Sequence, residues 1–236
     1  MAPVKIWELC AADRQRVFSP FCWAARLAVV HKGLDYETVP WQFTEKEKLQ
    51  AASGQGLVPV VEDSGKVVND SFAIAQYLER TYPDRPTLFG GPGGEAASLF
   101  VKNWMMLSAV KPALQPLMLV DIHSQLADDD KAYFREQREK RFGNKLEEVC
   151  PEGDRPAKLA AFKAALEPLR ATLGAQPFLG GEKPLYTDII VFSFFMMARS
   201  VSATKLLDAD DPVHAWRERM LDAYGGVGRK AVGYPV

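Results

Sequence analysis

The segment from Val4 to Gly33 constrains the fold most, because strand-like, polar and helical patterns follow one another there. Val4–Leu9 is short, apolar and rich in residues that favour strands. Ser19 is a favoured N-cap residue, and Pro20 suits the first helical position, where no N–H is needed. Apolar residues then recur at helical spacing up to Gly33, a residue type that often ends helices. The pattern predicts a strand, a loop and a helix over about 20–32.

The start of this helix has a chemical as well as a structural meaning. A helix N-terminus carries a positive partial charge and unpaired N–H groups, so it stabilises an anion beside it. The Ser19 hydroxyl lies at this point, and a hydroxyl that donates to a thiolate lowers the pKa of the thiol. The alternative is that Ser19 only caps the helix, a role worth about 0.5 to 2 kcal/mol.

The following segments indicate a small mixed α/β unit. A second strand comes after the helix at the distance that a right-handed βαβ crossover needs, which predicts a parallel pair. A polar segment follows, and then two strands joined by a tight turn lead into another helix. These segments are a strand at 36–39, a polar segment at 42–55 with a short helix at 46–52, strands at 58–62 and 66–68, and a helix from Asp70-Ser71 to Tyr82-Pro83.

The second part of the chain is helical almost throughout. Helical periodicity covers 95–125 with kinks at Pro112 and Pro116, 131–149, 157–173 with a kink at Pro168, 188–202 and 213–224. Residues 84–94 hold two prolines and four glycines, which predicts a linker. We therefore expect an α/β domain over 1–83, this linker and an all-helical domain over 95–236. The mixed charges of 135–145 predict a solvent-exposed helix face.

The composition of the 236 residues argues against several function classes. A formal net charge of -1 leaves no basic excess for a nucleic-acid backbone, so no nucleic-acid partner is expected. Three cysteines without a CxxC pair argue against a disulfide framework or a metal site. The N-terminus lacks a signal-peptide pattern, and the most apolar run, 189–198, is far shorter than the ~20 residues of a membrane span. We expect a cytoplasmic protein without a membrane partner.

Several motifs together resemble one known family. Ser19-Pro20-Phe21, Leu57-Val58-Pro59-Val60-Val61, Asp70-Ser71 and the helical second half are similar to a cytosolic glutathione transferase over nearly the whole length. Within that superfamily, the run 19–35 most resembles the bacterial glutathione-dependent β-etherases and related fungal etherase-type transferases. The resemblance implies a thioredoxin-like first domain, an all-helical second domain, glutathione as co-substrate and a homodimer.

The resemblance also implies which residues bind glutathione. Ser19 is expected to stabilise the glutathione thiolate, and Pro59 is expected to follow a cis peptide bond that presents the Val58 backbone to the ligand. Asp70 is expected to pair with the ammonium group of the γ-glutamyl end. Ser71 and the neighbouring helix N–H groups are expected to receive its carboxylate.

The glycyl end of glutathione lacks one usual partner in this sequence. Many relatives carry Lys, Arg or Gln before the Val-Pro pair, where this chain has Leu57, so Gln55, Lys46 or another donor is expected to bind the glycyl carboxylate. Trp41 follows the second strand, and the sequence leaves two alternatives for it. It lines the glutathione site, or it covers an edge of the core.

The acceptor site is expected to lie against the helical domain. Phe21, Met105 and Met106 are the residues expected to bind the acceptor, although a Met and aromatic stripe on a helix more often belongs to a core. The family usually places Ser or Thr three residues before Asp188, where this chain has leucine. Thr187 is therefore expected to cap that helix instead.

These residues lead to three functional hypotheses. In the first, the glutathione thiolate attacks an aromatic electrophile, and in the etherase branch the attacked carbon bears an aryl ether and loses a phenolate. In the second, the protein is a ligandin that holds glutathione and phenolic or hydrophobic ligands with little turnover. In the third, Cys22 is the nucleophile of a deglutathionylating reductase, because 19–22 is similar to the Cys-Pro-x-Cys of glutaredoxins with serine in the first position.

Overall fold

The computed structural model describes residues 2–235, and its first part contains a four-stranded sheet. The strands are β1 (Val4–Leu9), β2 (Tyr36–Trp41), β3 (Val60–Asp63) and β4 (Lys66–Asn69), in the order β2-β1-β3-β4. β1 pairs with β2 in parallel, whereas β3 is antiparallel to both β1 and β4. The predicted parallel pair and the predicted hairpin are thereby confirmed.

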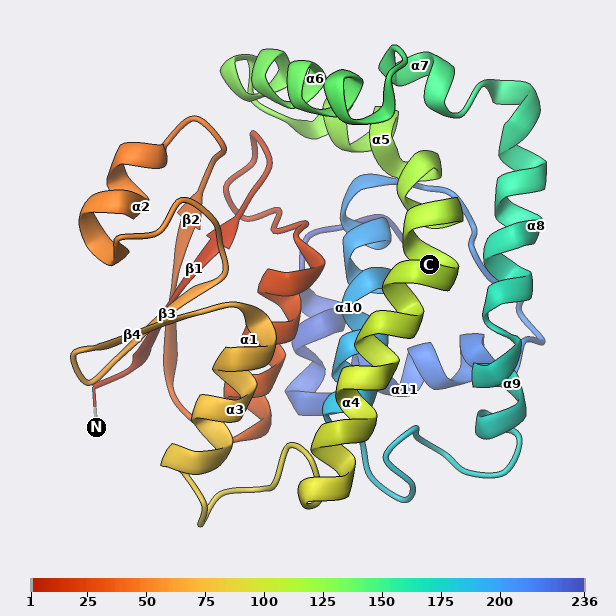
Figure 1. Ribbon diagram of the computed structural model, residues 1–236. Coiled ribbons are helices and arrows are strands. Elements are labelled where there is room, and N and C mark those ends of the chain that lie inside the picture. Colours follow the sequence, from red (N-terminus) through yellow and green to blue (C-terminus); the bar gives the residue numbers. More distant parts are fainter. Residues whose placement is uncertain (1, 236) are drawn as a thin grey trace.

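Helices cover both faces of this sheet (Figure 1). α1 (Pro20–His31) and α3 (Ser71–Thr81) lie on one face, and α2 (Lys46–Ser53) lies on the other. α1 contacts β1 on one side and α10 (Tyr186–Val201) of the helical part on the other. Its nearly continuous apolar sequence fits this double burial. The predicted helix ends within one residue of the observed one.

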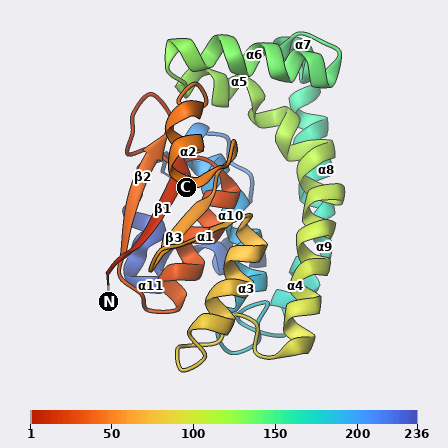
Figure 2. The same cartoon turned by 60° about the vertical axis from the view of Figure 1, so that its left-hand side comes forward.

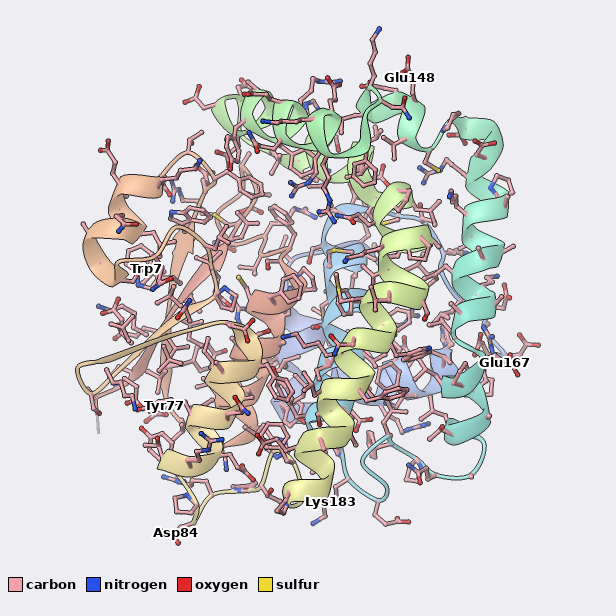
Figure 3. All side chains as sticks on the ribbon, viewed as in Figure 1. Trp7, Tyr77, Asp84, Glu148, Glu167 and Lys183 are labelled. Carbon is pink, nitrogen blue, oxygen red and sulfur yellow. The ribbon has the colours of Figure 1, made fainter. Side chains whose placement is uncertain are left out.

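The second part is helical, as predicted. Its elements are α4 (Pro92–Trp104), the π-helical η1 (Met105–Leu114), α5 (Gln115–Gln125), α6 (Asp128–Phe142), α7 (Leu146–Val149), the 3-10 turn η2 (Glu152–Asp154), α8 (Arg155–Ala165), α9 (Glu167–Leu173), α10 (Tyr186–Val201) and α11 (Pro212–Lys230). Figure 2 shows the sheet on one side of the molecule and α8 and α9 on the other. The loops that carry Asp84 and Lys183 lie at the bottom of Figure 3.

Several predicted boundaries differ from the structure, and two of them have a clear local cause. α4 begins at Pro92, three residues earlier than expected, because a proline at the first helical position lacks only an N–H that needs no partner. The predicted linker 84–94 is therefore too long. The predicted helix 131–149 is divided, because Gly143 adopts a left-handed conformation with φ of 74° and ends α6.

Pro92–Gln125 is one helical stretch whose middle part is π-helical. A proline inside a helix cannot donate the usual bond to the carbonyl four residues back. Pro112 lies within η1, where the wider π turn accommodates it. The stretch is long and apolar enough to cross a membrane by length and composition, but 56% of its most apolar window is buried inside the protein, as in a core helix.

α10 forms the core of the helical part, which confirms that 189–198 is a buried helix. Asp188 is fully buried at its start, and its carboxylate accepts from Leu185 N at 3.0 Å and from Trp216 Nε1 at 2.9 Å. Thr187 was expected to cap this helix, but its Oγ1 is buried without a hydrogen-bond partner among residues 2–235. The Asp188 side chain caps the helix in its place.

Candidate functional site

Four chain segments meet at one edge of the sheet. Trp7 of β1 lies opposite Val60 of β3, which in turn lies opposite Asn69 of β4. The carboxyl end of β1, the cis peptide bond before Pro59 and the start of α3 therefore share this edge. The backbone N–H of Phe18 donates to the last carbonyl of β1 at 3.2 Å, which brings the start of α1 to the same place.

Ser19 caps α1 and borders a cavity. Its Oγ accepts from the backbone N–H of Cys22 at 3.3 Å, and Pro20 occupies the first helical position. The hydroxyl accepts through oxygen in this bond, so its own proton remains available for donation. Ser19 is 6% exposed and lies in the cavity wall. The two roles considered for Ser19, cap and hydrogen-bond donor, are therefore compatible.

The loop before Ser19 is held by the helical part of the chain. The carbonyl of Val17 accepts from Trp23 Nε1 at 3.0 Å and from Ser200 Oγ at 2.9 Å. Arg16 Nη1 donates to the carbonyl of Ser200 at 2.6 Å. α10 and α1 thus fix the backbone that presents the Ser19 hydroxyl.

A cavity of about 260 Å³ opens beside Ser19, close to the lower limit of ~300 Å³ for small-molecule pockets. The start of α1, the segments at the ends of β2 and before β3, and helices η1, α5, α6 and α10 form its wall. The apolar lining residues are Leu9, Phe18, Phe21, Trp41, Phe43, Leu57, Val58, Met106, Val110, Leu119, Ile122, Phe134, Phe194 and Met197. The cavity therefore suits an apolar ligand about as large as a substituted aromatic ring.

The three residues expected to bind the acceptor do not all reach the cavity. Phe21 and Met106 line it, and the Phe21 ring meets Phe194 edge-on with centroids 6.2 Å apart. Met105 is fully buried and is not part of the wall, which corrects the expectation that both methionines face the acceptor. Successive residues on a helix point in different directions, so Met105 faces the core while Met106 faces the cavity.

Asp70 and Ser71 stand at the start of α3. Asp70 has a φ of 69°, a conformation that non-glycine residues rarely adopt and that often marks functional positions. Its Oδ1 accepts from Phe72 N at 2.9 Å and from Ala73 N at 3.1 Å. Two of the helix N–H groups expected to receive a carboxylate are thus already paired, and Lys102 Nζ lies 3.7 Å from Asp70 Oδ2. Lys102 therefore brings a cation to the start of α3.

The peptide bond between Val58 and Pro59 is cis, as predicted. Val58 lines the cavity beside Leu57, whose side chain is 79% exposed. Gln55 does not line the cavity, and its Oε1 accepts from Asn69 Nδ2 at 3.0 Å. Gln55 therefore lies beside the residue that precedes Asp70, at the edge of the site.

Trp41 covers an edge of the core and also borders the cavity. It is 2% exposed and packs against Phe43, and it also lines the cavity. Its Nε1 donates to the carbonyl of Glu45 at 2.8 Å. The Glu45 carboxylate accepts from Arg14 Nη2 at 2.9 Å, and this bond holds the pKa of Glu45 down, to about 2. The segment between β2 and α2 is therefore fixed by an ion pair.

Two features of the site have no distinct signal in the sequence. Asp130 at the start of α6 accepts from Phe43 N and Thr44 N, each at 2.9 Å, and so joins α6 to the β2–α2 segment. Arg138 and Arg141 line the cavity, although 135–145 was expected to form a solvent-exposed face. Charge patterning alone does not distinguish a solvated arginine from one that faces a cavity. Only their shared helical face with Phe134 hints at this placement.

Cys22 faces away from the cavity. It is fully buried, the Leu9 N–H donates to its Sγ at 3.4 Å, and burial raises the pKa of its thiol to about 12. Glu8, also fully buried, forms an ion pair with Arg26 next to it, and burial raises the pKa of Glu8. A thiol in this environment is not a ready nucleophile, because the thiolate is the reactive species.

Metal ligands are not grouped in the part of the chain described. Among residues 2–235, no three His, Cys, Asp or Glu side chains are placed to hold one metal ion together. Cys10, Cys22 and Cys150 are free and buried.

Two family models match the chain. The model of the glutathione S-transferase N-terminal domain matches residues 18–81, and that of the glutathione S-transferase C-terminal domain matches residues 96–222. The second match alone covers more than half of the chain. Together they span the sheet edge, Ser19 and the helices that wall the cavity.

Individual relatives agree with these matches. The glutathione S-transferase-like protein ustS of Aspergillus flavus is 33% identical over 134 residues, which are 53% of this chain and 48% of that protein. The chain thus spans about half the length of the first relatives that it matches. The probable glutathione S-transferase GSTU6 of rice, Oryza sativa subsp. japonica, is 28% identical over 89% of this chain and 84% of its own.

Solved structures share the fold over nearly the whole chain. The glutathione S-transferase CsGST83044 of Ceriporiopsis subvermispora, determined in complex with glutathione, has a TM-score of 0.84 and 25% identity over 95% of this chain and 99% of its own. The glutathione transferase GSTFuA3 of Phanerochaete chrysosporium has a TM-score of 0.80 and 23% identity over 96% and 97%. With the family models, these likenesses show that the chain belongs to the glutathione S-transferase family.

Proposed function

We propose that this protein is an enzyme that transfers glutathione to an aromatic electrophile and that Ser19 stabilises the glutathione thiolate. The observation that carries this proposal is the Ser19 hydroxyl at the start of α1, in the wall of an apolar cavity. Its oxygen is occupied by the Cys22 N–H, so the proton is free to point at a sulfur. A hydrogen bond to the charged form of a thiol lowers its pKa.

The γ-glutamyl end of glutathione is proposed to bind at the start of α3. Asp70 Oδ2 is not used in capping and would pair with the ammonium group. Ser71 and Lys102 would receive the carboxylate, and Lys102 already lies 3.7 Å from Asp70 Oδ2. Trp41 and Val58 would contact the middle of the tripeptide, and Gln55 or Lys46 would meet its glycyl end.

The electrophile is proposed to bind between the two parts of the chain. Phe21 of α1 and Met106 of η1 line the cavity and give it apolar walls suited to an arene. In a β-aryl ether, sulfur would form a bond to the carbon that bears the aryloxy group. The carbon–oxygen bond would break, and the phenolate would leave with the electron pair.

The experiment that tests the transferase proposal is a turnover assay of the purified protein with two electrophiles. 1-Chloro-2,4-dinitrobenzene reports aromatic substitution through formation of its glutathione thioether, and a model β-aryl ether reports etherase activity through glutathione-dependent release of a phenol. We expect conjugation of the first compound above the uncatalysed rate. Release of phenol only when glutathione is present would identify the etherase branch. If neither compound reacts while both bind, the ligandin hypothesis takes first place.

The Cys22-dependent reductase is disfavoured by the environment of the thiol. Cys22 is fully buried, and its pKa is raised to about 12, which keeps the sulfur protonated near neutral pH. Its Sγ accepts from a backbone N–H instead of facing the cavity. We also propose a cytoplasmic location, where a reducing environment suits three free cysteines.

The protein is proposed to act as a homodimer. Leu99 and Phe100 of α4 and Leu107 of η1 are large apolar side chains that are 45%, 71% and 64% exposed in the single chain. Exposed apolar residues gathered on one helical stretch are typical of an interface. A second copy of the chain would cover them with the same surface, as two-fold symmetry requires.

A further inference from the structure

The cavity beside Ser19 has a charged end built by one helix. Phe134, Arg138 and Arg141 of α6 all line it, and their spacing of four and three residues places them on one helical face. α6 crosses the top of the molecule in Figure 1, above the space between the sheet and α5. Of the residues that line the cavity, these two arginines are the charged ones, and none is acidic.

Neither arginine has a charged partner. Among residues 2–235, no carboxylate forms an ion pair with Arg138 or Arg141, and neither guanidinium donates a hydrogen bond. Arg138 instead lies over the Phe134 ring, with its guanidinium carbon 4.7 Å from the ring centroid. Arg135 on the same helix is the contrast, because it pairs with Glu139 at 2.9 Å and with Glu147 at 2.8 Å. The arginine that faces away from the cavity is neutralised, and the two that face it are not.

The two guanidinium groups lie close enough for the charge of Arg141 to disfavour the charge of Arg138. Burial lowers the pKa of Arg138, and the nearby charge of Arg141 lowers it further. Two like charges beside an apolar wall are relieved by an anion that both contact. The planar guanidinium group suits a carboxylate, to which it donates two parallel hydrogen bonds.

We propose that Arg138 and Arg141 bind a carboxylate carried by the aromatic electrophile, so the preferred acceptors of this protein are acidic arenes. This inference rests on the transferase function proposed above and names its substrate class. The apolar wall would hold the ring, and the two arginines would orient it by its acidic substituent while the reacting carbon faces Ser19.

The glycyl carboxylate of glutathione is a second candidate ligand for these two arginines. Leu57 gives that carboxylate no polar side chain to bind, so an arginine of α6 is a competing partner for it. The acceptor is favoured because Arg138 and Arg141 lie among the apolar side chains of the cavity, including Phe134 on their own helix. The test must therefore measure the two ligands separately.

The test uses an unreactive pair of ligands, 4-methyl-3-nitrobenzoate and its neutral primary amide, titrated by calorimetry with glutathione present. The proteins are the wild type, Arg138→Gln/Arg141→Gln, and Lys140→Gln as the matched control. Lys140 is an exposed cation on the same helix that does not line the cavity. Arg141→Gln alone serves as a second variant, because Arg141 is exposed and its replacement leaves the core intact.

We expect the wild type to bind the benzoate more tightly than the amide, and the double variant to lose about 10-fold or more of its benzoate affinity. Affinity for the amide should stay within about two-fold, which also shows that the variant is folded. Lys140→Gln should match the wild type. The inference is overturned if the wild type does not prefer the benzoate, or if both ligands lose affinity alike. It is also overturned if the double variant loses affinity for glutathione while it keeps the benzoate.

A turnover assay with 4-chloro-3-nitrobenzoate and 1-chloro-2,4-dinitrobenzene separates this inference from the proposed function. With either compound, the glutathione sulfur bonds to the ring carbon that carries chlorine. The carbon–chlorine bond breaks, and chloride leaves with the electron pair. If neither is conjugated, the proposed transferase function fails. If the neutral compound is conjugated but the arginines do not affect the benzoate, the function stands and the acidic-arene inference fails.

Discussion

Asp70 shows how one residue has both a structural and a proposed binding role. Oδ1 caps α3 through Phe72 N and Ala73 N, while Oδ2 lies 3.7 Å from Lys102 Nζ. The φ of 69° holds the side chain in this position. The two functions divide between the two oxygens, so a substitution that keeps the cap and removes the charge separates them.

The first prediction uses that separation. Asp70→Asn should keep the cap, since Asn caps helices about as well as Asp, and should weaken glutathione binding by about 1.5 to 3 kcal/mol, the range for a hydrogen bond to a charged group. Calorimetric titration with glutathione measures the affinity, and urea unfolding measures the free energy of unfolding. Asp84→Asn, in the loop at the bottom of Figure 3, is the control. An unchanged glutathione affinity in folded Asp70→Asn would remove Asp70 from the site.

The sequence predicted which residues shape the backbone better than it predicted which side chains face the cavity. Ser19 was identified as a cap from the helical spacing of the residues after it, whereas the cis bond before Pro59 was expected from the family resemblance. Met105 and Arg138 were misjudged, because which side of a helix faces the cavity depends on packing against other elements. The π turn at Met105–Leu114 shifts those faces further from the regular α-helical period.

At the scale of elements, the β2–α2 segment is held in place by charged groups. Glu45 accepts hydrogen bonds from Arg14 and from the backbone N–H of Gln42, and its carbonyl accepts from Trp41 Nε1. Asp130 holds the same segment to α6. The position of Trp41 in the cavity wall therefore depends on the ion pair between Glu45 and Arg14.

The second prediction concerns acid. The hydrogen bond from Arg14 lowers the pKa of Glu45 from 4.5 to about 2, so its contribution to stability is present above pH 4.5 and is lost as the pH falls toward 2. Glu45→Gln should cost about 1 kcal/mol at pH 7, the value of a partly exposed ion pair. The cost should shrink steadily below pH 4.5, as measured by urea unfolding at several pH values. Glu47→Gln, an exposed neighbour outside any ion pair among residues 2–235, should cost little throughout. A cost for Glu45→Gln that is the same at pH 7 and pH 3 would contradict the account.

The secondary structure was largely predictable at this scale, but its breaks were not. Apolar spacing located the long helices because burial of one face repeats along the sequence. Gly143 divides a predicted helix through a left-handed turn, although the charge pattern around it continues without interruption. Asp188 replaces the expected Thr187 cap because its carboxylate gathers several donors in a buried place.

At the scale of the whole molecule, the site exists only where the two parts of the chain meet. Ser200 of α10 bonds to Val17, and Tyr186 OH donates to the Ser71 carbonyl at 2.7 Å. The start of α1 and the start of α3 are thus each anchored by α10. Neither the sheet nor the helices alone would keep Ser19 in place beside the cavity.

The third prediction concerns assembly. Phe100→Asp should convert a dimer into a species of the monomer mass, 26.2 kDa, because it places a charge in the proposed apolar interface. Light scattering over micromolar concentrations measures the mass. Val67→Asp, at an exposed apolar residue on β4 outside the helical stretch that holds Phe100, is the control and should leave the dimer intact. A wild-type protein of monomer mass across that range would reject the homodimer.

The central claim, that Ser19 stabilises the glutathione thiolate, is tested most directly by the pH dependence of thiolate absorbance in the complex with glutathione. The wild-type midpoint should lie below ~8.5, the ordinary value for a thiol. Ser19→Ala should raise it by about 1 to 2 units, since 1.5 to 3 kcal/mol is the worth of a hydrogen bond to a charged group. Cys22→Ala should leave it unchanged. Equal midpoints for wild type and Ser19→Ala, both saturated with glutathione, would contradict the account and leave Ser19 as a helix cap.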